Sequence, residues 1–192
     1  QGSTAAALAR DHAAEANRLK QKYDELLADR NEVGNQNQAL LDQVAALIAQ
    51  GKDAHLTADG NIEIRLPSDV TFASGEATLT KSGQASVRSL RETLAGEYSP
   101  YKVRVEGHTD DQPLKRTKDK WGDNFGLASA RALSVLRFME SDMGIEPGRL
   151  ESASRGQHVP VAANASKADR AKNRRVNIVV VIPRTEALAM AK

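Results

Sequence analysis

The sequence predicts an α/β sandwich of the α+β kind, in which a mixed sheet carries its helices on one face, preceded by one long α-helix. Two observations predict this fold. Residues 5–50 contain no proline and one glycine, whereas residues 59–183 alternate between segments of two-residue apolar period and segments of helical period. The segments come in the order strand, helix, strand, helix, strand, short helical turn and strand, which favours helices packed on one side of a sheet.

Bulk composition narrows the class of protein. A chain of 192 residues suits one domain with an appendage, and 27 Lys and Arg against 25 Asp and Glu leave no large excess of charge for binding nucleic acid. The absence of cysteine excludes disulfides, zinc–thiolate sites and thiol nucleophiles. No run approaches the ~18 apolar residues of a membrane span, and the first residues lack a signal-peptide pattern. We expect any membrane-attaching segment to lie outside these residues.

Residues 1–50 are predicted to form a helical stalk, because most of them are good helix formers. A heptad reading with Tyr23 at position a gives a mostly apolar row at the d positions, which are Ala5, His12, Leu19, Leu26, Val33, Leu40 and Leu47. The a row is weaker and includes Arg30 and Asn37. A helix with one apolar stripe must cover that stripe. We expect a homodimeric coiled coil through residues 5–50, with folding back onto the following domain as the alternative.

The globular domain is predicted to begin after a linker at residues 51–58. Strict alternation over residues 62–66 predicts a strand with one buried face. Residues 69–75 then read as a loop with one buried aromatic, Phe72, and helical spacing of apolar residues predicts a helix over residues 79–94.

The second predicted strand, residues 101–107, ends at a polar cluster. This cluster, residues 108–111, reads His-Thr-Asp-Asp and lies where a strand gives way to a loop. After a basic segment, Asp123 or Asn124 can cap a helix that runs to about Met143.

Two more strands are predicted in the last part of the domain. They are residues 150–156 and residues 176–182, the latter being the most β-prone run of the chain. The loop between them contains a short helical turn. The globular domain therefore spans residues 59–183, and residues 184–192 are predicted to be a tail.

A site that binds an amino acid or the end of a peptide needs two opposite charges. A carboxylate of the protein binds the ligand's ammonium, and a guanidinium binds the ligand's carboxylate. Asp110 follows the second predicted strand, and Arg131 lies nearly two turns into the next helix. The planar fork of arginine can donate two parallel hydrogen bonds to a carboxylate. Thr109 and Asn124 can add neutral hydrogen bonds, and the free amides at the start of the helix favour an anion. From the residues alone, a turn cap at Asp110 and a solvated arginine at Arg131 stay open as alternatives.

Four motifs follow one another in the order found in one protein family. They are Val-Glu-Gly-His-Thr-Asp at residues 105–110, Asn-Phe-Gly-Leu-Ala-Ser-Ala-Arg-Ala at 124–132, Gly-Arg-Leu at 148–150 with Gly156, and Asn-Arg-Arg-Val at 173–176. This pattern resembles the OmpA-like peptidoglycan-binding domain family. The resemblance implies noncovalent binding of the diaminopimelate-containing peptide stem of peptidoglycan. It also implies that Asp110 receives the ammonium of diaminopimelate and Arg131 its carboxylate.

The resemblance implies further ligand-binding residues, which are Thr109, Asn124, Leu127, Phe72, Ala73, Arg174 and Arg175. Strand alternation places the two arginines on opposite faces without deciding which one faces the pocket. The chain departs from the family at Ala128, where a serine is usual, and in the long loop over residues 111–123. That loop resembles the loop of MotB-like proteins and related lipoproteins. Four of its basic side chains either touch ligand carboxylates or stay solvated, namely Lys115, Arg116, Lys118 and Lys120.

Two other kinds of site are weaker predictions. His108, Asp110, Asp111 and His158 are competent metal ligands, but nothing in their spacing joins them. Glu106 with Asp110 is the only visible carboxylate pair for a hydrolase, and strand alternation sends such residues in different directions. We therefore expect no metal, no cofactor and no enzymatic activity.

The sequence thus predicts a noncovalent cell-wall anchor in the periplasm of a diderm bacterium. Its expected partners are peptidoglycan, the outer or inner membrane, and a second copy of the stalk. Nucleic acid is not an expected partner. The alternative is a structural or motor component, such as a flagellar stator or a secretion-envelope assembly, in which wall binding is one part. A transmembrane helix with an acidic residue would favour a motor, whereas a lipidated cysteine would favour an outer-membrane lipoprotein.

Overall fold

A computed structural model describes residues 2–183, with side chains from residue 14 onward. These residues fall into two compact units, residues 2–42 and residues 43–183. The predicted tail, residues 184–192, and the side chains of the first heptads lie outside the described part. Among the helices of residues 2–183, none has both the length and the apolar character that crossing a membrane requires.

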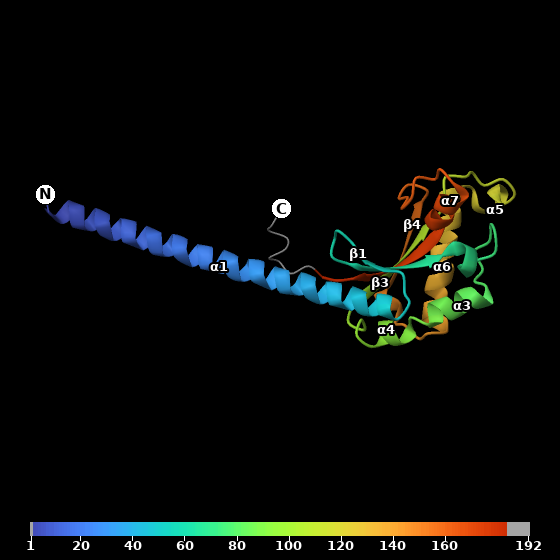
Figure 1. Cartoon of the computed structure of the whole chain (residues 1–192), viewed down its shortest axis with the longest axis horizontal. Coiled ribbons are helices and arrows are strands. Elements are labelled where there is room, and N and C mark those ends of the chain that lie inside the picture. Colours follow the sequence, from blue (N-terminus) through green and yellow to red (C-terminus); the bar gives the residue numbers. More distant parts are fainter. Residues whose placement is uncertain (1, 184–192) are drawn as a thin grey trace. The chain divides into compact units, whose positions relative to one another are not determined.

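The first unit consists of most of α1, a single helix over Gly2–Ala49 that confirms the predicted long helix (Figure 1). Within residues 19–26 of this helix, large apolar side chains are exposed, with exposed fractions of 63% for Leu19, 62% for Tyr23 and 59% for Leu26. The last two turns of α1 belong to the second unit, where Val44 and Leu47 are buried. The apolar stripe over residues 19–26 is therefore uncovered in a single chain.

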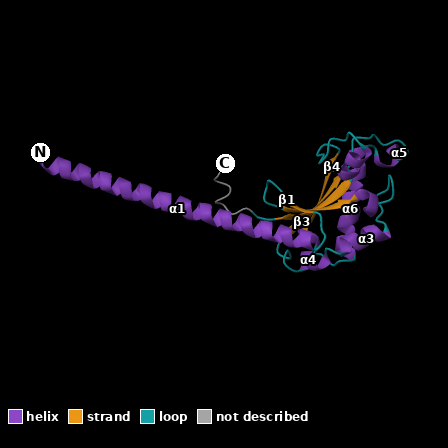
Figure 2. Ribbon diagram, viewed as in Figure 1, coloured by secondary structure: helices purple, strands orange, loops and turns teal. Residues whose placement is uncertain are grey.

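The second unit is built on a mixed five-stranded sheet in the order β1-β2-β5-β3-β4 (Figure 2). Its strands are β1 Ala54–Leu56, β2 Ile62–Pro67, β3 Lys102–His108, β4 Leu150–Gly156 and β5 Arg175–Val181. β3 and β4 run parallel, and all other neighbouring pairs are antiparallel. The mixed sheet and its four predicted strands are confirmed. β1 lies in the predicted linker, because three residues are too few to show an alternating pattern.

One long helix and several short ones connect the strands of this unit. They are α2 Ser68–Thr71, α3 Lys81–Arg88, α4 Arg91–Ala95, α5 Lys118–Trp121, α6 Asn124–Ser141, the 3₁₀ helix η1 Pro147–Arg149, and α7 Lys167–Asn173. The helix predicted over residues 79–94 is divided into α3 and α4. The long helix α6 begins as predicted, because the Asp123 side chain accepts a hydrogen bond from the Gly126 amide at 2.9 Å.

One face of the sheet forms the hydrophobic core with the helices. The buried strand residues on this face include Ile62, Ile64, Val103, Val105, Val176, Ile178 and Val180. Val87, Leu94, Val135 and Met139 of the helices are also fully buried, as is Leu90 between α3 and α4. The apolar side chains that recur at every second strand residue therefore pack against the apolar side chains of the helices in one core layer, as the sequence predicts.

The other face of the sheet carries a polar network. Asn177 in β5 donates a hydrogen bond to Glu63 at 2.8 Å and contacts His108 Nε2 at 3.2 Å. Glu106 in β3 forms an ion pair with Arg155 at 2.6 Å. Since the Asn177 amide and the two carboxylates of this network are paired, the central strands can be buried on both faces although one face is polar.

Helix α6 crosses β3 at very short range. A Cβ atom on Gly107 would lie 2.0 Å from the carbonyl oxygen of Ala128, so any side chain at this position would clash with the backbone of α6. Ala128 is itself fully buried. Glycine in the predicted strand and alanine in the predicted helix therefore permit a contact between backbones.

Replacing Gly107 with alanine is expected to lower the free energy of unfolding by roughly 1–3 kcal/mol or more, because backbone must move to admit the methyl group. The matched control is Gly148→Ala in η1, where the nearest atom to an added Cβ is a Glu146 side-chain oxygen at 3.7 Å. Urea unfolding of both variants would measure the difference. Equal stability of the two variants would contradict the proposed close packing.

His108 gives the stability of this unit a pH dependence. Its side chain is 2% exposed, and burial, together with the positive charges of Arg175, Arg155 and Arg65, lowers its pKa to about 3. The unfolded chain binds a proton at about pH 6.5. Between these values the unfolded state holds more protons, so stability rises with pH across this window.

The His108 contribution should lower the free energy of unfolding by about 2 kcal/mol at pH 5 relative to pH 7.5. The variant His108→Gln lacks this proton, while its other titrating groups, including the neighbouring Glu106, are the same. Urea unfolding of both proteins at the two pH values should therefore show a smaller loss in the variant. Identical losses would show that His108 is not held neutral.

Candidate functional site

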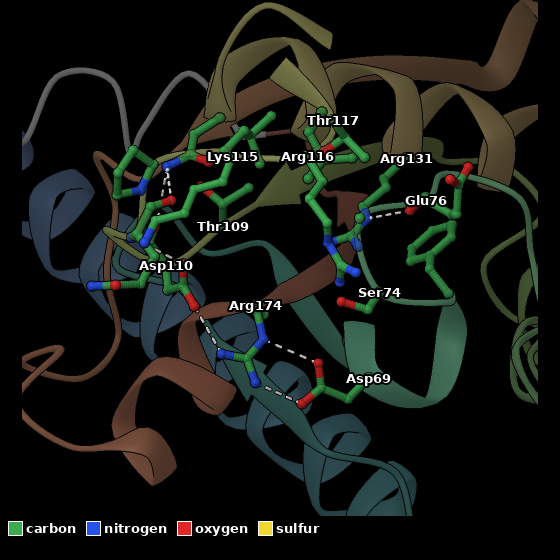
Figure 3. Close-up of a pocket in the computed structure, with 17 residues that line it drawn as sticks. Asp69, Ser74, Glu76, Thr109, Asp110, Lys115, Arg116, Thr117, Arg131 and Arg174 are labelled. Carbon is green, nitrogen blue, oxygen red and sulfur yellow. Dashed lines mark hydrogen bonds and ion pairs between the residues drawn. The ribbon is translucent and has the colours of Figure 1, made fainter. Parts of the chain in front are cut away.

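A cavity of about 700 Å³ opens where β3 ends and α6 begins (Figure 3). Five parts of the chain line it: α2 with the segment after it, the residues just after β3, the loop before α5, α6, and the residue just before β5. The polar residues that line it are Asp69, Ser74, Glu76, Thr109, Asp110, Gln112, Lys115, Arg116, Thr117, Asn124, Arg131 and Arg174. Phe72 and Leu127 contribute apolar surface.

Seven of the nine predicted ligand-binding residues line this cavity, and Ala73 and Arg175 do not. Arg175 is 3% exposed, and it donates hydrogen bonds to Asn177 at 3.0 Å and to the Val159 carbonyl at 3.2 Å, on the polar face of the sheet. Arg174 lines the pocket instead. The alternation of the two arginines is as predicted, and the structure assigns the pocket side to Arg174.

Arg131 is a buried cation without an anion. Its side chain is 4% exposed, its Nε donates to the Glu76 carbonyl at 2.9 Å, and its guanidinium carbon lies 5.0 Å from the centre of the Phe72 ring. Within residues 14–183 it forms no ion pair. Burial is the main cause that lowers its pKa, to about 10, so the guanidinium stays charged at neutral pH.

Asp110 is not the free carboxylate that the sequence suggests. Its Oδ2 accepts a hydrogen bond from Arg174 Nη1 at 2.8 Å, and its Oδ1 accepts one from the Gln112 amide at 3.1 Å. Arg174 also binds Asp69 with two hydrogen bonds, of 3.0 and 2.7 Å, which lower the pKa of Asp69. This Asp69–Arg174–Asp110 cluster joins two carboxylates to one guanidinium and carries one net negative charge.

Two uncharged polar residues of the pocket, Asn124 and Thr109, have different roles. Asn124 Nδ2 lies within hydrogen-bond distance of the carbonyls of Asp110 and Gln112 and of the Gln157 side chain, so Asn124 holds the loop in place. The hydroxyl of Thr109 is buried and has no hydrogen-bond partner in the described chain. Since such a group usually finds a partner, Thr109 is the better candidate for a ligand contact. Ala128 packs on Gly107 outside the pocket lining, so a hydroxyl there would not line it.

Several pocket residues were missed in the sequence. The sequence pattern places Asp69 only in a predicted loop, and its partner Arg174 lies 105 residues away, a separation that no local pattern reports. Of the four basic loop residues, Lys115 and Arg116 line the pocket, whereas Lys118 does not and Lys120 forms an ion pair with Glu76 at 2.7 Å. In the described chain no three His, Asp or Glu side chains gather as a metal site would require.

Comparison with known proteins shows which family the domain resembles in sequence and in fold. A profile of the OmpA family matches residues 71–174. Motility protein B of Bacillus subtilis is 27% identical over 165 residues, which cover 83% of this chain and 60% of that protein. This chain therefore spans less than two thirds of that relative.

Two solved structures have the same fold. A MotB-like protein from Desulfovibrio vulgaris matches with a TM-score of 0.68 and 27% identity, over 82% of this chain and 97% of that one. The cell wall anchor of the T6SS from Pseudomonas aeruginosa matches with a TM-score of 0.62 and 30% identity, over 75% of this chain and 97% of that one.

Proposed function

Because the chain belongs to the OmpA family, we propose that residues 43–183 bind peptidoglycan noncovalently, through the diaminopimelate of its peptide stem. The observation that carries this proposal is Arg131, a buried guanidinium without an anion, which shares a pocket with a cluster of net negative charge. Such a pocket suits a zwitterion. No chemical step is proposed, and the relatives described above are a motility protein and a cell wall anchor rather than enzymes.

The ligand's ammonium would bind at the Asp69–Arg174–Asp110 cluster, where it supplies the second positive charge that two carboxylates require. The ligand's carboxylate would accept hydrogen bonds from the terminal nitrogens of Arg131, whose Nε is already used by Glu76. A polar group of the ligand would supply the hydrogen-bond partner that the buried hydroxyl of Thr109 lacks within the described chain. Lysine in place of diaminopimelate lacks the second carboxylate, so it would leave Arg131 unpaired.

The cellular role is an anchor between a membrane and the wall, in the periplasm of a diderm bacterium. The likeness to the T6SS cell wall anchor supports this reading, and the likeness to motility protein B supports a second candidate, a stator-like motor component in which wall binding is one part. Both roles use the same pocket. They differ in the membrane segment to which the stalk connects.

The stalk is proposed to dimerise. Leu19, Tyr23 and Leu26 expose a continuous apolar stripe at the a and d positions, and pairing with a second copy would bury it. Two wall-binding units on one stalk would then raise the effective concentration of the second site once the first has bound. A modest affinity at each pocket is sufficient for such an anchor.

Arg131→Gln is expected to weaken binding about 30-fold or more, because it leaves the ligand carboxylate without its charged partner in a buried site. Asp110→Asn should weaken binding about tenfold, since Asp69 retains one negative charge near the ammonium. The measurement is calorimetric titration with a diaminopimelate-containing stem peptide and with its lysine counterpart, together with cosedimentation with purified sacculi.

The control for this experiment is Arg137→Gln, which removes the same charge from an exposed position of α6. Circular dichroism should show the fold intact in all three variants. Binding by Arg131→Gln and Asp110→Asn that equals binding by the control would remove the assignment of the pocket. Equal affinity of the wild type for the two peptides would remove diaminopimelate as the recognised residue.

Leu26→Lys is expected to shift the protein from dimer to monomer, because it places a charge in the proposed dimer seam while the single chain leaves this position exposed. Ala28→Lys, on the outer face of the same heptad, is the control and should remain dimeric. Sedimentation equilibrium measures both. A monomeric wild type would contradict the coiled coil directly.

A further inference from the structure

The loop over residues 111–123 brings two cations to the pocket wall, Lys115 and Arg116. Neither forms an ion pair or a side-chain hydrogen bond with any residue of the described chain. Figure 3 shows the Arg116 side chain entering the pocket in the direction of Ser74 and Arg131. A guanidinium directed toward a buried guanidinium is repelled by it unless an anion lies between them.

The position of Arg116 is held by contacts on its C-terminal side. Trp121 Nε1 donates to the Gly75 carbonyl at 2.9 Å, and Lys120 binds the Glu76 carboxylate at 2.7 Å. The Thr117 side chain packs on Gly75, where an added Cβ would lie 3.1 Å from its methyl group. The same short segment holds Arg131 through the Glu76 carbonyl. Both arginines are thus tied to residues 75–76.

The charges of the pocket do not balance. Four cations line it, which are Lys115, Arg116, Arg131 and Arg174. Three carboxylates line it, and Glu76 is already paired with Lys120. Two carboxylates, Asp69 and Asp110, therefore face four cations. A zwitterion with one ammonium and one carboxylate adds no net charge, so it would leave this excess uncompensated.

We propose that Arg116 is a second carboxylate-binding residue of the pocket, so that the preferred ligand is a stem peptide with one ammonium and at least two carboxylates. This inference rests on the proposed function, in which Arg131 binds the carboxylate at the far end of diaminopimelate. Arg116 then binds a different carboxylate of the same peptide. The stem offers two, one on the γ-linked D-glutamate and one at the peptide-linked centre of diaminopimelate when the stem ends there.

The consequence is that the pocket would distinguish stem peptides with free carboxylates from stem peptides whose carboxyl groups are amidated. A carboxamide in place of the second carboxylate keeps the shape of the ligand and removes the charge that Arg116 pairs with. Wall peptides with these carboxyl groups free would be held more tightly than peptides in which they are amidated. Arg116 is exposed, so its replacement leaves the core intact.

The test uses N-acetyl-L-alanyl-γ-D-glutamyl-meso-diaminopimelate and its diamide, in which the glutamate carboxyl and the peptide-linked diaminopimelate carboxyl are both carboxamides. The full chain and its variants Arg116→Gln and Arg137→Gln are titrated with each peptide at low salt. The wild type should bind the free acid about tenfold more tightly than the diamide. In Arg116→Gln this ratio should fall below about twofold.

Arg137→Gln should keep the wild-type ratio, because it removes a charge of the same sign outside the pocket. Loss of the ratio in both variants would overturn the assignment, since it would indicate long-range attraction alone. An unchanged ratio in Arg116→Gln, or equal wild-type binding of the two peptides, would overturn this inference and leave the proposed function standing. Absence of binding to either peptide would overturn both.

Discussion

The contact between Gly107 and Ala128 is the constraint on which the rest of the site depends. Because β3 and α6 approach each other there through backbone atoms, the end of the strand and the first turns of the helix share one small volume. Thr109 and Asp110 follow Gly107 by two and three residues, and Arg131 follows Ala128 by three. A wider separation of strand and helix would leave these groups too far apart to bind one amino acid.

The Asp69–Arg174–Asp110 cluster keeps the two charges of the pocket from neutralising each other. If Asp110 were free, it would be attracted to Arg131, and a ligand would first have to break that pair. Arg174 holds Asp110 at 2.8 Å and Asp69 at 2.7 Å, while Arg131 is stacked on Phe72 and bound to a carbonyl. The pocket is therefore organised for a ligand before the ligand arrives, which lowers the cost of binding.

Sequence reasoning recovered the fold and most of the pocket, because its signals are local. Alternation located β2 and β3, and high β propensity located β5. The Asp123 cap located the start of α6, and the motifs of the family located Asp110 and Arg131. What it missed depends on contacts between distant residues or on elements too short for a period. The strand β1 has three residues, and Asp69 acquires its role from Arg174 at the far end of the domain. Alternation separated Arg174 from Arg175, but only tertiary structure decides which face is the pocket.

The order of the strands makes the pocket depend on the last strand of the domain. β2 and β3 do not pair with each other, and the last strand, β5, lies between them. Arg174, the residue just before β5, also joins Asp69 from the first half of the domain to Asp110 from the second. Because β5 lies between β2 and β3, neither the complete sheet nor the pocket can form until the last strand is in place. A copy of this domain that has lost β5 and the residue before it would thus lack the pocket through which we propose that it binds the wall.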